Sequence, residues 1–280
     1  MAMKTCMFCG LSKPLTSFYK SRVAPDGHWY YCIDCEKKYK REQREREEKG
    51  IKRHIVSFSG GKDSTAMLIL LLEHKIPIDE IIYFDCQEFE FPQMQNHIKL
   101  VEEKLNVRIT KISTEKSFLY HLFDHPRGEL GKGFSWPMPG LRWCTNFKIN
   151  KIKQYLRKHR PYTQYIGYAF DEQKRAIKGS KTNSKRNSFI TNEYPLIQSG
   201  ITEKEALRIC KKYGFHWDGL YDVFDRVSCW CCPLQKDSDV LKLKKHFPEM
   251  YNRLKQWDSK ARTYFKNDPD YFKRLESSCI

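Results

Sequence analysis

Apolar and polar residues follow one another along the middle of the chain in short blocks that predict alternating strands and helices. Blocks of four to six largely apolar residues predict buried strands, and longer blocks carry apolar residues at helical spacing, as in the stripe of Met94, Ile98 and Val101. The strands are predicted at 54–58, 81–84, 107–112 and 163–167, and the helices at 63–72, 92–105, 118–123 and from 141 onward. Strands that alternate with helices predict an α/β domain with a mostly parallel sheet and helices on both faces.

The two ends of the chain follow other patterns. Residues 37–53 hold many charges and almost nothing apolar, which predicts a solvated helical linker. Residues 236–280 predict helices with apolar positions that pack against the main domain. The pattern therefore divides the chain into a small segment 1–36, the linker 37–53, a main domain 54–235 and a helical C-terminal extension 236–280.

Composition limits the class of protein and its compartment. The chain has 280 residues, of which 40% are hydrophobic, enough for one large domain with a small appendage. No apolar run reaches the roughly 18 to 20 residues of a membrane span, and the N-terminus lacks the apolar segment of a signal peptide. We therefore expect a cytoplasmic protein without a membrane partner. In that compartment eleven cysteines indicate metal or redox chemistry rather than disulfide bonds.

The first four cysteines form two C-x-x-C pairs, Cys6 with Cys9 and Cys32 with Cys35. Two such pairs predict a tetrahedral Zn²⁺ site, in which the metal replaces the core that a segment of 36 residues cannot build. The segment 1–36 is therefore interpreted as a zinc ribbon, with a redox role for either pair as the alternative. The aromatic residues that precede Cys32 would either pack over the metal site or stack on nucleic-acid bases.

The stretch Ser59-Gly60-Gly61-Lys62-Asp63-Ser64-Thr65 joins the first predicted strand of the main domain to its helix. Paired glycines allow a backbone with positive φ, and the amides of such a turn and of a helix start form a concavity that suits phosphate. Hydroxyl groups add donors, and Lys62 would supply a mobile positive charge. The spacing is not the Walker pattern G-x-x-x-x-G-K-[ST].

Ligands of such sheets lie beyond the carboxyl ends of the strands. That rule predicts one crevice bounded by Ser59–Thr65, Asp85–Glu88 and Tyr168–Arg175. Asp85, at the end of a predicted strand, would bind a ribose or Mg²⁺, or would simply cap the strand.

A second group of cysteines lies in the main domain. Cys229, Cys231 and Cys232 occupy three of four positions ahead of a proline, and with Cys144 they predict the ligands of a [4Fe–4S] cluster. Cys231 is either the fourth ligand or points elsewhere, in which case one iron would stay open. A second zinc site and reduced cysteines without a metal are the alternatives.

The string S-G-G-K-D-S at 59–64 resembles the loop of the PP-loop superfamily, which includes the N-type ATP pyrophosphatases and the phosphoadenylyl-sulfate (PAPS) reductases. The resemblance extends over roughly 54–235. The segment from Asp85 to Pro92 resembles the superfamily's D-T-G-x-E-F-P but is one residue longer, with Asp85, Glu88 and Pro92 as the counterparts of its two acids and its proline, and Cys86 and Gln87 in place of Thr-Gly.

Two further strings carry the resemblance. R-W-C-T-x-x-K, which begins at Arg142 and ends at Lys148, is similar to a motif whose Arg and Lys contact the anionic groups of the nucleotide. The segment 167–175 is similar to G-x-R-x-x-E-S-x-x-R but is one residue shorter, with Glu172 and Arg175 as the counterparts of its glutamate and its last arginine. Tyr168 and Ala169, and no arginine, follow Gly167, so the ligand need not carry the same anionic group as the substrate of the reductases.

The resemblance implies an adenine nucleotide alpha hydrolase-like, Rossmann-like fold that binds ATP or phosphoadenylyl sulfate with Mg²⁺. The implied nucleotide-binding residues are Ser59, Gly60, Gly61, Lys62, Asp63, Ser64, Thr65, Asp85, Glu88, Glu172 and Arg175, and the implied catalytic residues are Lys62, Asp63, Arg142, Cys144 and Lys148. In the pyrophosphatase version an acceptor oxygen attacks the α-phosphorus, pyrophosphate leaves, and sulfur from a donor, delivered through the cysteine site, displaces AMP.

Charge points to the acceptor. The formal net charge is +17, and residues 125–190 carry fifteen Lys and Arg against three acids. This excess and the zinc ribbon predict a nucleic acid, tRNA or DNA, as partner. The alternative is that the basic residues form a solvated surface without a binding role.

Two other functions are compatible with the same residues. A PAPS reductase would use a thiol donor and release sulfite, but the tail that ends in Cys279 lacks the reductases' E-C-G-[LI]-H string. The third reading is a nucleic-acid-binding module with a vestigial nucleotide site.

Overall fold

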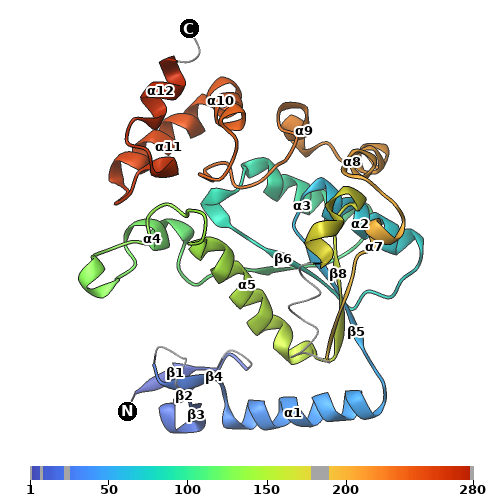
Figure 1. Cartoon of the computed structure of the whole chain (residues 1–280). Coiled ribbons are helices and arrows are strands. Elements are labelled where there is room, and N and C mark those ends of the chain that lie inside the picture. The colour runs from blue at the N-terminus through green and yellow to red at the C-terminus, as the bar shows by residue number, and fades with distance from the viewer. Residues whose placement is uncertain (1, 7–8, 22–25, 178–188, 278–280) are drawn as a thin grey trace.

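The computed structural model describes residues 2–6, 9–21, 26–177 and 189–277 (Figure 1). Cys279, whose role the sequence leaves open, lies outside the described residues.

A five-stranded parallel sheet forms the centre of the main domain. Its strands are β5 (Arg53–Phe58), β6 (Glu80–Phe84), β7 (Ile109–Ile112), β8 (Tyr162–Ile166) and β9 (Ile190–Glu193), in the order β7-β6-β5-β8-β9. Each neighbouring pair is parallel. The predicted α/β fold is confirmed, and β9 is an additional edge strand that the apolar pattern does not reveal.

Helices cover both faces of this sheet. Since crossovers between parallel strands are right-handed, the strand order places the helices leading to β6 and β7 on one face and the helix leading to β8 on the other. Accordingly, α2 (Lys62–Glu73) and α3 (Pro92–Leu105) lie opposite α5 (Trp143–Leu156) (Figure 1). Two later helices, α7 (Pro195–Gln198) and α8 (Glu203–Lys212), pack on α2. Because α2 lies between the sheet and these helices, its residues from Ser64 to Ile69 are all buried.

The C-terminal helices pack against the loop between α4 (Phe118–Phe123) and α5. They are α10 (Asp237–His246), α11 (Pro248–Lys260) and α12 (Tyr271–Ser277), whereas α9 (Leu220–Val223) precedes them and contacts the glycine turn, where the Tyr221 hydroxyl accepts the Lys62 N–H at 2.9 Å. Trp136 Nε1 in the loop donates to Asp258 Oδ1 at 2.8 Å, and Ser135 Oγ lies 2.7 Å from Thr263 Oγ1. The predicted helical C-terminal extension is thus confirmed, and hydrogen bonds connect it to the loop between α4 and α5.

The N-terminal segment forms two small antiparallel sheets and one long helix. β1 (Met3–Thr5) pairs with β2 (Ser12–Pro14), β3 (Phe18–Lys20) pairs with β4 (His28–Cys32), and α1 (Ile33–Glu48) follows. A separate core of Cys6, Phe18, Tyr31, Cys32 and Cys35 holds this segment together. The charged helix begins at Ile33, so Cys35 lies on its first turn.

Arg157, directly after α5, is the main contact between this segment and the main domain. Its guanidinium group lies 4.6 Å from the ring centroid of Trp29, 5.6 Å from that of Tyr31, and 2.8 Å from Glu36 Oε1. Tyr31 also donates to the Gln154 carbonyl at 2.7 Å. Trp29 and Tyr31 therefore pack against the neighbouring domain.

Candidate nucleotide site and metal centre

A cavity of about 440 Å³ opens at the carboxyl ends of β5, β6 and β8, where Phe58, Phe84 and Ile166 line it. This is the position at which α/β sheets bind ligands, and the volume falls within the usual range for small-molecule sites. Nine of the predicted site residues line the cavity: Ser59, Gly61, Lys62, Asp63, Ser64, Lys148, Glu172, Arg175 and Cys229. A cavity therefore lies at the predicted strand ends, bounded by the glycine turn and by the segment after β8.

The glycine turn is held tightly in place. Gly60 has a φ of +77°, and a Cβ there would lie 2.8 Å from Met94 Cε. Ser64 Oγ accepts the Ser59 N–H at 3.1 Å and donates to the Gly61 carbonyl at 3.0 Å. A Cβ on Gly167, at the end of β8, would lie 2.9 Å from Ser64 Cα. Only glycines allow this close approach, so the start of α2 is fixed before any ligand binds.

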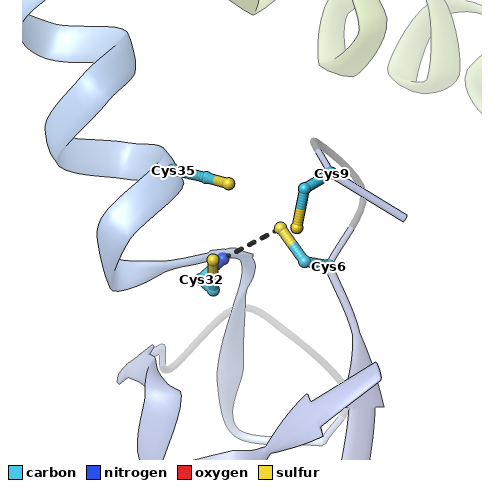
Figure 2. Close-up of side chains that lie close together, drawn as sticks. All are labelled: Cys6, Cys9, Cys32 and Cys35. Atoms are coloured by element: carbon cyan, nitrogen blue, oxygen red, sulfur yellow. Dashed lines mark hydrogen bonds between the residues drawn. The ribbon is translucent and has the colours of Figure 1, made fainter. Parts of the chain in front are cut away.

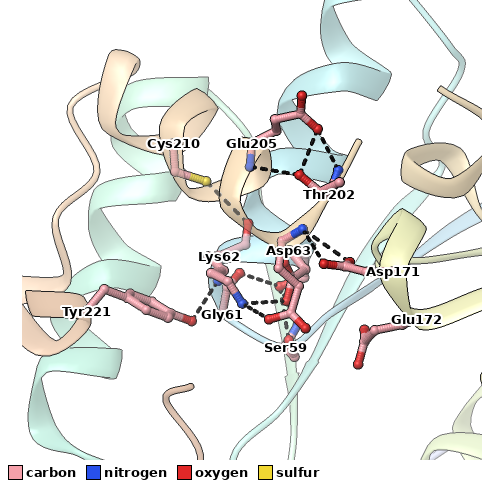
Figure 3. A network of polar contacts seen from close by, with 12 residues as sticks. Ser59, Gly61, Lys62, Asp63, Asp171, Glu172, Thr202, Glu205, Cys210 and Tyr221 are labelled. Carbon is pink, nitrogen blue, oxygen red and sulfur yellow. Dashed lines mark hydrogen bonds and ion pairs between the residues drawn. The ribbon is translucent and has the colours of Figure 1, made fainter. Parts of the chain in front are cut away.

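Lys62 is buried rather than mobile, which corrects the expectation from the sequence. It is 4% exposed, and its Nζ lies 2.5 Å from Glu203 Oε2 and 3.2 Å from Asp63 Oδ2 (Figure 3). Burial raises the pKa of Asp63 to about 6 against the opposing effect of Lys62, and the carboxylates of Glu203 and Glu172 add to the rise. The lysine is thus neutralised by two acids that a phosphate would have to displace or a cation would have to screen.

The remaining cations of the cavity differ in their partners. Arg175 pairs with Glu172, and its guanidinium group lies 4.5 Å from the ring centroid of Tyr168. Lys148, from α5, and Arg226 also line the cavity, and neither makes an ion pair with the part of the chain that the structure describes. Two cations are therefore free to meet an anionic ligand.

The segment after β6 places a different acid in the cavity from the one predicted. Glu88 is exposed and outside the cavity wall, and Asp85 Oδ1 accepts the Gln87 N–H at 2.7 Å, as a strand-end cap does. Glu90 lines the cavity instead, in contact with the Tyr83 hydroxyl, and burial raises its pKa. When the segment is aligned at Pro92, its last three residues match the E-F-P that ends D-T-G-x-E-F-P. The sequence therefore already indicated Glu90 as the acid of the site.

Four other predicted residues lie outside the cavity wall. Thr65 is fully buried with its Oγ1 3.0 Å from His97 Nε2, and the Gly60 carbonyl accepts from Trp217 Nε1 at 2.7 Å. Arg142 is exposed, and Cys144 is half-buried. Arg142 lies near the second cysteine group, where its charge lowers the pKa of Cys232 against a larger rise caused by burial.

The second cysteine group is gathered in one region. Burial raises the pKa of Cys144, and the neighbouring Cys232 raises it further. Cys231 is 1% exposed and is affected in the same way by Cys232 and Cys144. Of the thiols, only Cys229 and Cys86 line the cavity; Cys86 was not predicted as a site residue. Its position in the D-T-G-like segment is the signal that could have indicated it.

The first four cysteines form a compact metal centre. Sγ atoms of Cys6, Cys9, Cys32 and Cys35 all lie within 4.8 Å of one another (Figure 2). The Cys32 N–H donates to Cys6 Sγ at 3.2 Å, and Lys13 Nζ lies 3.3 Å from Cys32 Sγ. A tetrahedral ion with bonds of roughly 2.3 Å to sulfur fits this arrangement, and the two donors stabilise thiolate charge. Over the described ranges, no other three His, Cys, Asp or Glu ligands come this close together.

The parallel sheet and the S-G-G-K-D-S turn at its carboxyl edge define a PP-loop, adenine nucleotide alpha hydrolase-like protein. Residues 53–235 match the phosphoadenosine phosphosulfate reductase domain, so the chain belongs to that family.

Two uncharacterized proteins of Methanocaldococcus jannaschii are similar to the chain. MJ0066 is 23% identical over 215 residues, which cover 75% of this chain and 42% of the relative. MJ0973 is 26% identical over 206 residues, which cover 70% of this chain and 45% of the relative. The chain thus spans less than half the length of these relatives. Among the described residues, no helix is both long and apolar enough to cross a membrane.

Proposed function

We propose that this protein is an enzyme that binds ATP at the Gly60-Gly61 loop and adenylates an acceptor, with release of pyrophosphate, in preparation for sulfur transfer. The observation that carries the proposal is that the phosphate-type loop and two thiols line one cavity. A family that handles nucleotide-linked sulfur supplies the chemical context.

The charges of the cavity favour a nucleotide that arrives with a metal ion. Lys62 and Arg175 are already paired with carboxylates, so only Lys148 and Arg226 are left on the cavity wall to balance a nucleotide with several negative charges. Asp63 Oδ1 is buried and has no hydrogen-bond partner among the described residues, which fits a carboxylate that ligates Mg²⁺. Asp63 and Glu203 would hold the ion, which would neutralise phosphate charge when bound. Metal-bound ATP therefore suits this cavity better than a metal-free sulfonucleotide.

The chain's own residues would position the reacting groups. The amides at the start of α2 and the hydroxyls of Ser59 and Ser64 would hold the phosphates in line for attack by an acceptor oxygen on the α-phosphorus. Lys148 and Arg226 would stabilise the charge that develops on the departing pyrophosphate. Tyr168, an uncharged side chain of the cavity wall, lies beside Arg175, so this side of the cavity offers a second phosphate group such as that of PAPS less positive charge than a second arginine would.

The later cysteines are proposed to hold an iron–sulfur cluster. Cys144, Cys229, Cys231 and Cys232 are the candidate ligands. A cubane cluster keeps its cysteine sulfurs further apart than a single zinc ion does, and no three of these sulfurs fall within the 4.8 Å that the zinc-type group meets. The donor set therefore suits a cluster better than a second zinc ion. When bound, the cluster would supply a sulfur-binding iron.

We propose a nucleic acid as the acceptor. α5 carries Lys148, Lys151 and Lys153 without an acid, and it runs from the zinc-binding segment to the cavity region (Figure 1). A phosphate backbone that lies along this helix would reach both. A reductase is the second candidate, because thiols line the cavity, as attack on a sulfonucleotide requires.

One experiment separates these functions. Protein purified without oxygen is analysed for zinc and iron and then assayed for pyrophosphate release from ATP, with and without RNA or DNA, and for sulfite release from PAPS with a thiol donor. Nucleic-acid-dependent pyrophosphate release is the expected result. Sulfite release alone would favour the reductase, and silence in both assays together with nucleic-acid binding would favour a binding module with a vestigial nucleotide site.

A further inference from the structure

Tyr221 contacts the glycine turn from α9, 159 residues further along the chain than Lys62. Its hydroxyl oxygen accepts the Lys62 N–H at 2.9 Å, and the side chain lines the nucleotide cavity (Figure 3). Lys62 is the first residue of α2, so its N–H has no partner within the helix. Tyr221 therefore occupies one of the amides on which phosphate binding at a helix start depends.

The phenol group of Tyr221 has a donor that the protein does not use. A tyrosine hydroxyl has one proton to donate and lone pairs with which to accept. Because its oxygen accepts from Lys62, the proton points elsewhere, and no acceptor for it lies among the described residues. Burial raises the pKa of Tyr221, so the hydroxyl stays protonated at neutral pH. Its proton is thus available to a ligand in the cavity.

Neighbouring residues hold the hydroxyl group in this position. Trp217 packs edge-on against the Tyr221 ring with centroids 4.7 Å apart, and its Nε1 donates to the Gly60 carbonyl at 2.7 Å. Trp217 is itself 2% exposed and stacks on His97. Gly61 leaves room for the hydroxyl, because a Cβ there would lie 3.2 Å from the Tyr221 oxygen. The donor is therefore fixed beside the turn before a ligand binds.

The charges at the turn favour a neutral donor. Lys62 Nζ lies 2.5 Å from Glu203 Oε2 and 3.2 Å from Asp63 Oδ2, so this ammonium group is already neutralised. Carboxylates so close to the start of α2 repel a phosphate, whereas an uncharged hydroxyl group has no counter-ion to give up. Tyr221 therefore offers a phosphate a hydrogen bond that breaks no ion pair of the protein.

We propose that Tyr221 binds the pyrophosphate part of the nucleotide, because its hydroxyl group accepts from the Lys62 amide and donates to a β- or γ-phosphate oxygen. Tyr221 lies outside every string that carries the resemblance to the PP-loop superfamily. Its role rests on the proposed nucleotide site and adds to it a residue that selects the ligand. The ligand class is a nucleotide with a phosphate chain long enough to reach the turn, which a nucleoside monophosphate lacks.

Calorimetric titrations of the full chain with ATP and Mg²⁺, with pyrophosphate and Mg²⁺, and with AMP test this role. Tyr221→Phe removes only the hydroxyl group. This variant is expected to bind ATP and pyrophosphate about tenfold more weakly or worse, as the loss of a hydrogen bond to a charged group predicts, and to bind AMP like the wild type.

Tyr213→Phe is the matched control. The Tyr213 hydroxyl donates to Glu73, and neither residue lines the cavity. This variant also loses one tyrosine hydroxyl with its hydrogen bond, so it should bind all three ligands like the wild type. Melting temperatures of both variants are measured in parallel.

Two results would overturn the role of Tyr221. One is that Y221F binds ATP and pyrophosphate with the affinity of the wild type. The other is that Y221F loses affinity for ATP, pyrophosphate and AMP equally and melts at a lower temperature, because that pattern shows a purely structural role. If Y221F does not fold, a crystal structure of the wild type with pyrophosphate decides. The Tyr221 oxygen should then lie about 2.5 to 3.0 Å from a phosphate oxygen, and a hydroxyl group without such a contact would exclude the role.

Failure of this inference differs from failure of the proposed function. Wild-type protein that binds neither ATP nor pyrophosphate fails the proposed function. Wild-type protein that binds ATP, with an affinity that Y221F shares, fails only the inference about Tyr221.

Discussion

Replacing Gly167 by alanine tests the close packing on which the nucleotide site depends. Gly167 ends β8 against the first turn of α2. The added Cβ would lie 2.9 Å from Ser64 Cα, 3.0 Å from Ser64 N and 3.1 Å from the Asp63 carbonyl carbon. All three neighbours are backbone atoms, so a change of rotamer cannot relieve the contact, and the strand end and the helix start must move apart.

The expected magnitude follows from this geometry. Overpacking of this kind costs about 1 to 3 kcal/mol, and each kcal/mol lowers the melting temperature of a domain of this size by about 2 to 4 °C. The displaced backbone is also the part that would hold the phosphates. Loss of one well-aligned hydrogen bond costs about 1 kcal/mol, so ATP should bind about fivefold more weakly or worse.

Thermal unfolding and ATP titration of G167A measure both effects. Gly50→Ala is the matched control, because Gly50 has a φ of +63° but a Cβ there meets nothing within 4 Å. That variant carries backbone strain without a clash and should bind ATP normally. A G167A protein that melts and binds ATP like the wild type would refute the close approach of β8 to the loop.

Three further perturbations address the metal centre, a buried histidine and the cavity charge. Cys32→Ser should lower the zinc content, measured by mass spectrometry, from one ion per chain to none, and should unfold the N-terminal segment; retained zinc would contradict the four-cysteine centre. Burial lowers the pKa of His97 to about 3, so between pH 6.5 and 3 this histidine is protonated in the unfolded chain but neutral in the folded chain. The free energy of unfolding should therefore fall below pH 6.5 by up to about 1.4 kcal/mol per pH unit, and His97→Gln, compared with the wild type by denaturant unfolding at pH 5 and 7, should lack this part of the pH dependence. The same pH dependence in both proteins would contradict this role of His97. Lys148→Ala should weaken ATP binding about tenfold or more, since a charged hydrogen bond contributes about 1.5 to 3 kcal/mol. Lys153→Ala, at an exposed position of the same helix, should leave ATP binding unchanged. An equal loss of ATP affinity in both variants would place the nucleotide elsewhere.

The periodicity of apolar residues was enough to predict the sheet and its helices. Strands such as β6 are buried on both sides and contain nearly continuous apolar runs, and α2 is apolar because it is enclosed between the sheet and other helices. β9 could not be predicted in this way, because Ile190–Glu193 is half-buried at the sheet edge and mixes apolar with polar residues. Its place in the sheet depends on pairing with β8, which local patterns do not encode.

The residues of the candidate site likewise fall into those fixed by local sequence and those fixed by tertiary contacts. Residues fixed by a local string, such as the glycine turn and the four zinc-type cysteines, were predictable because their spacing carries the geometry. The burial of Lys62 was not, because its partner Glu203 lies 141 residues away. The presence of Cys86 and Cys229 on one cavity wall likewise needs the tertiary fold, since Trp230 joins two turns that no sequence pattern connects.

A crystal structure with magnesium and a non-hydrolysable ATP analogue would show where the nucleotide binds. We expect the phosphates to lie against the amides at the start of α2, with the α-phosphate inside the cavity that Lys148 and Cys229 line. A nucleotide bound away from Gly60 and Gly61, or a cavity that stays empty at saturating analogue, would rule out the proposed site.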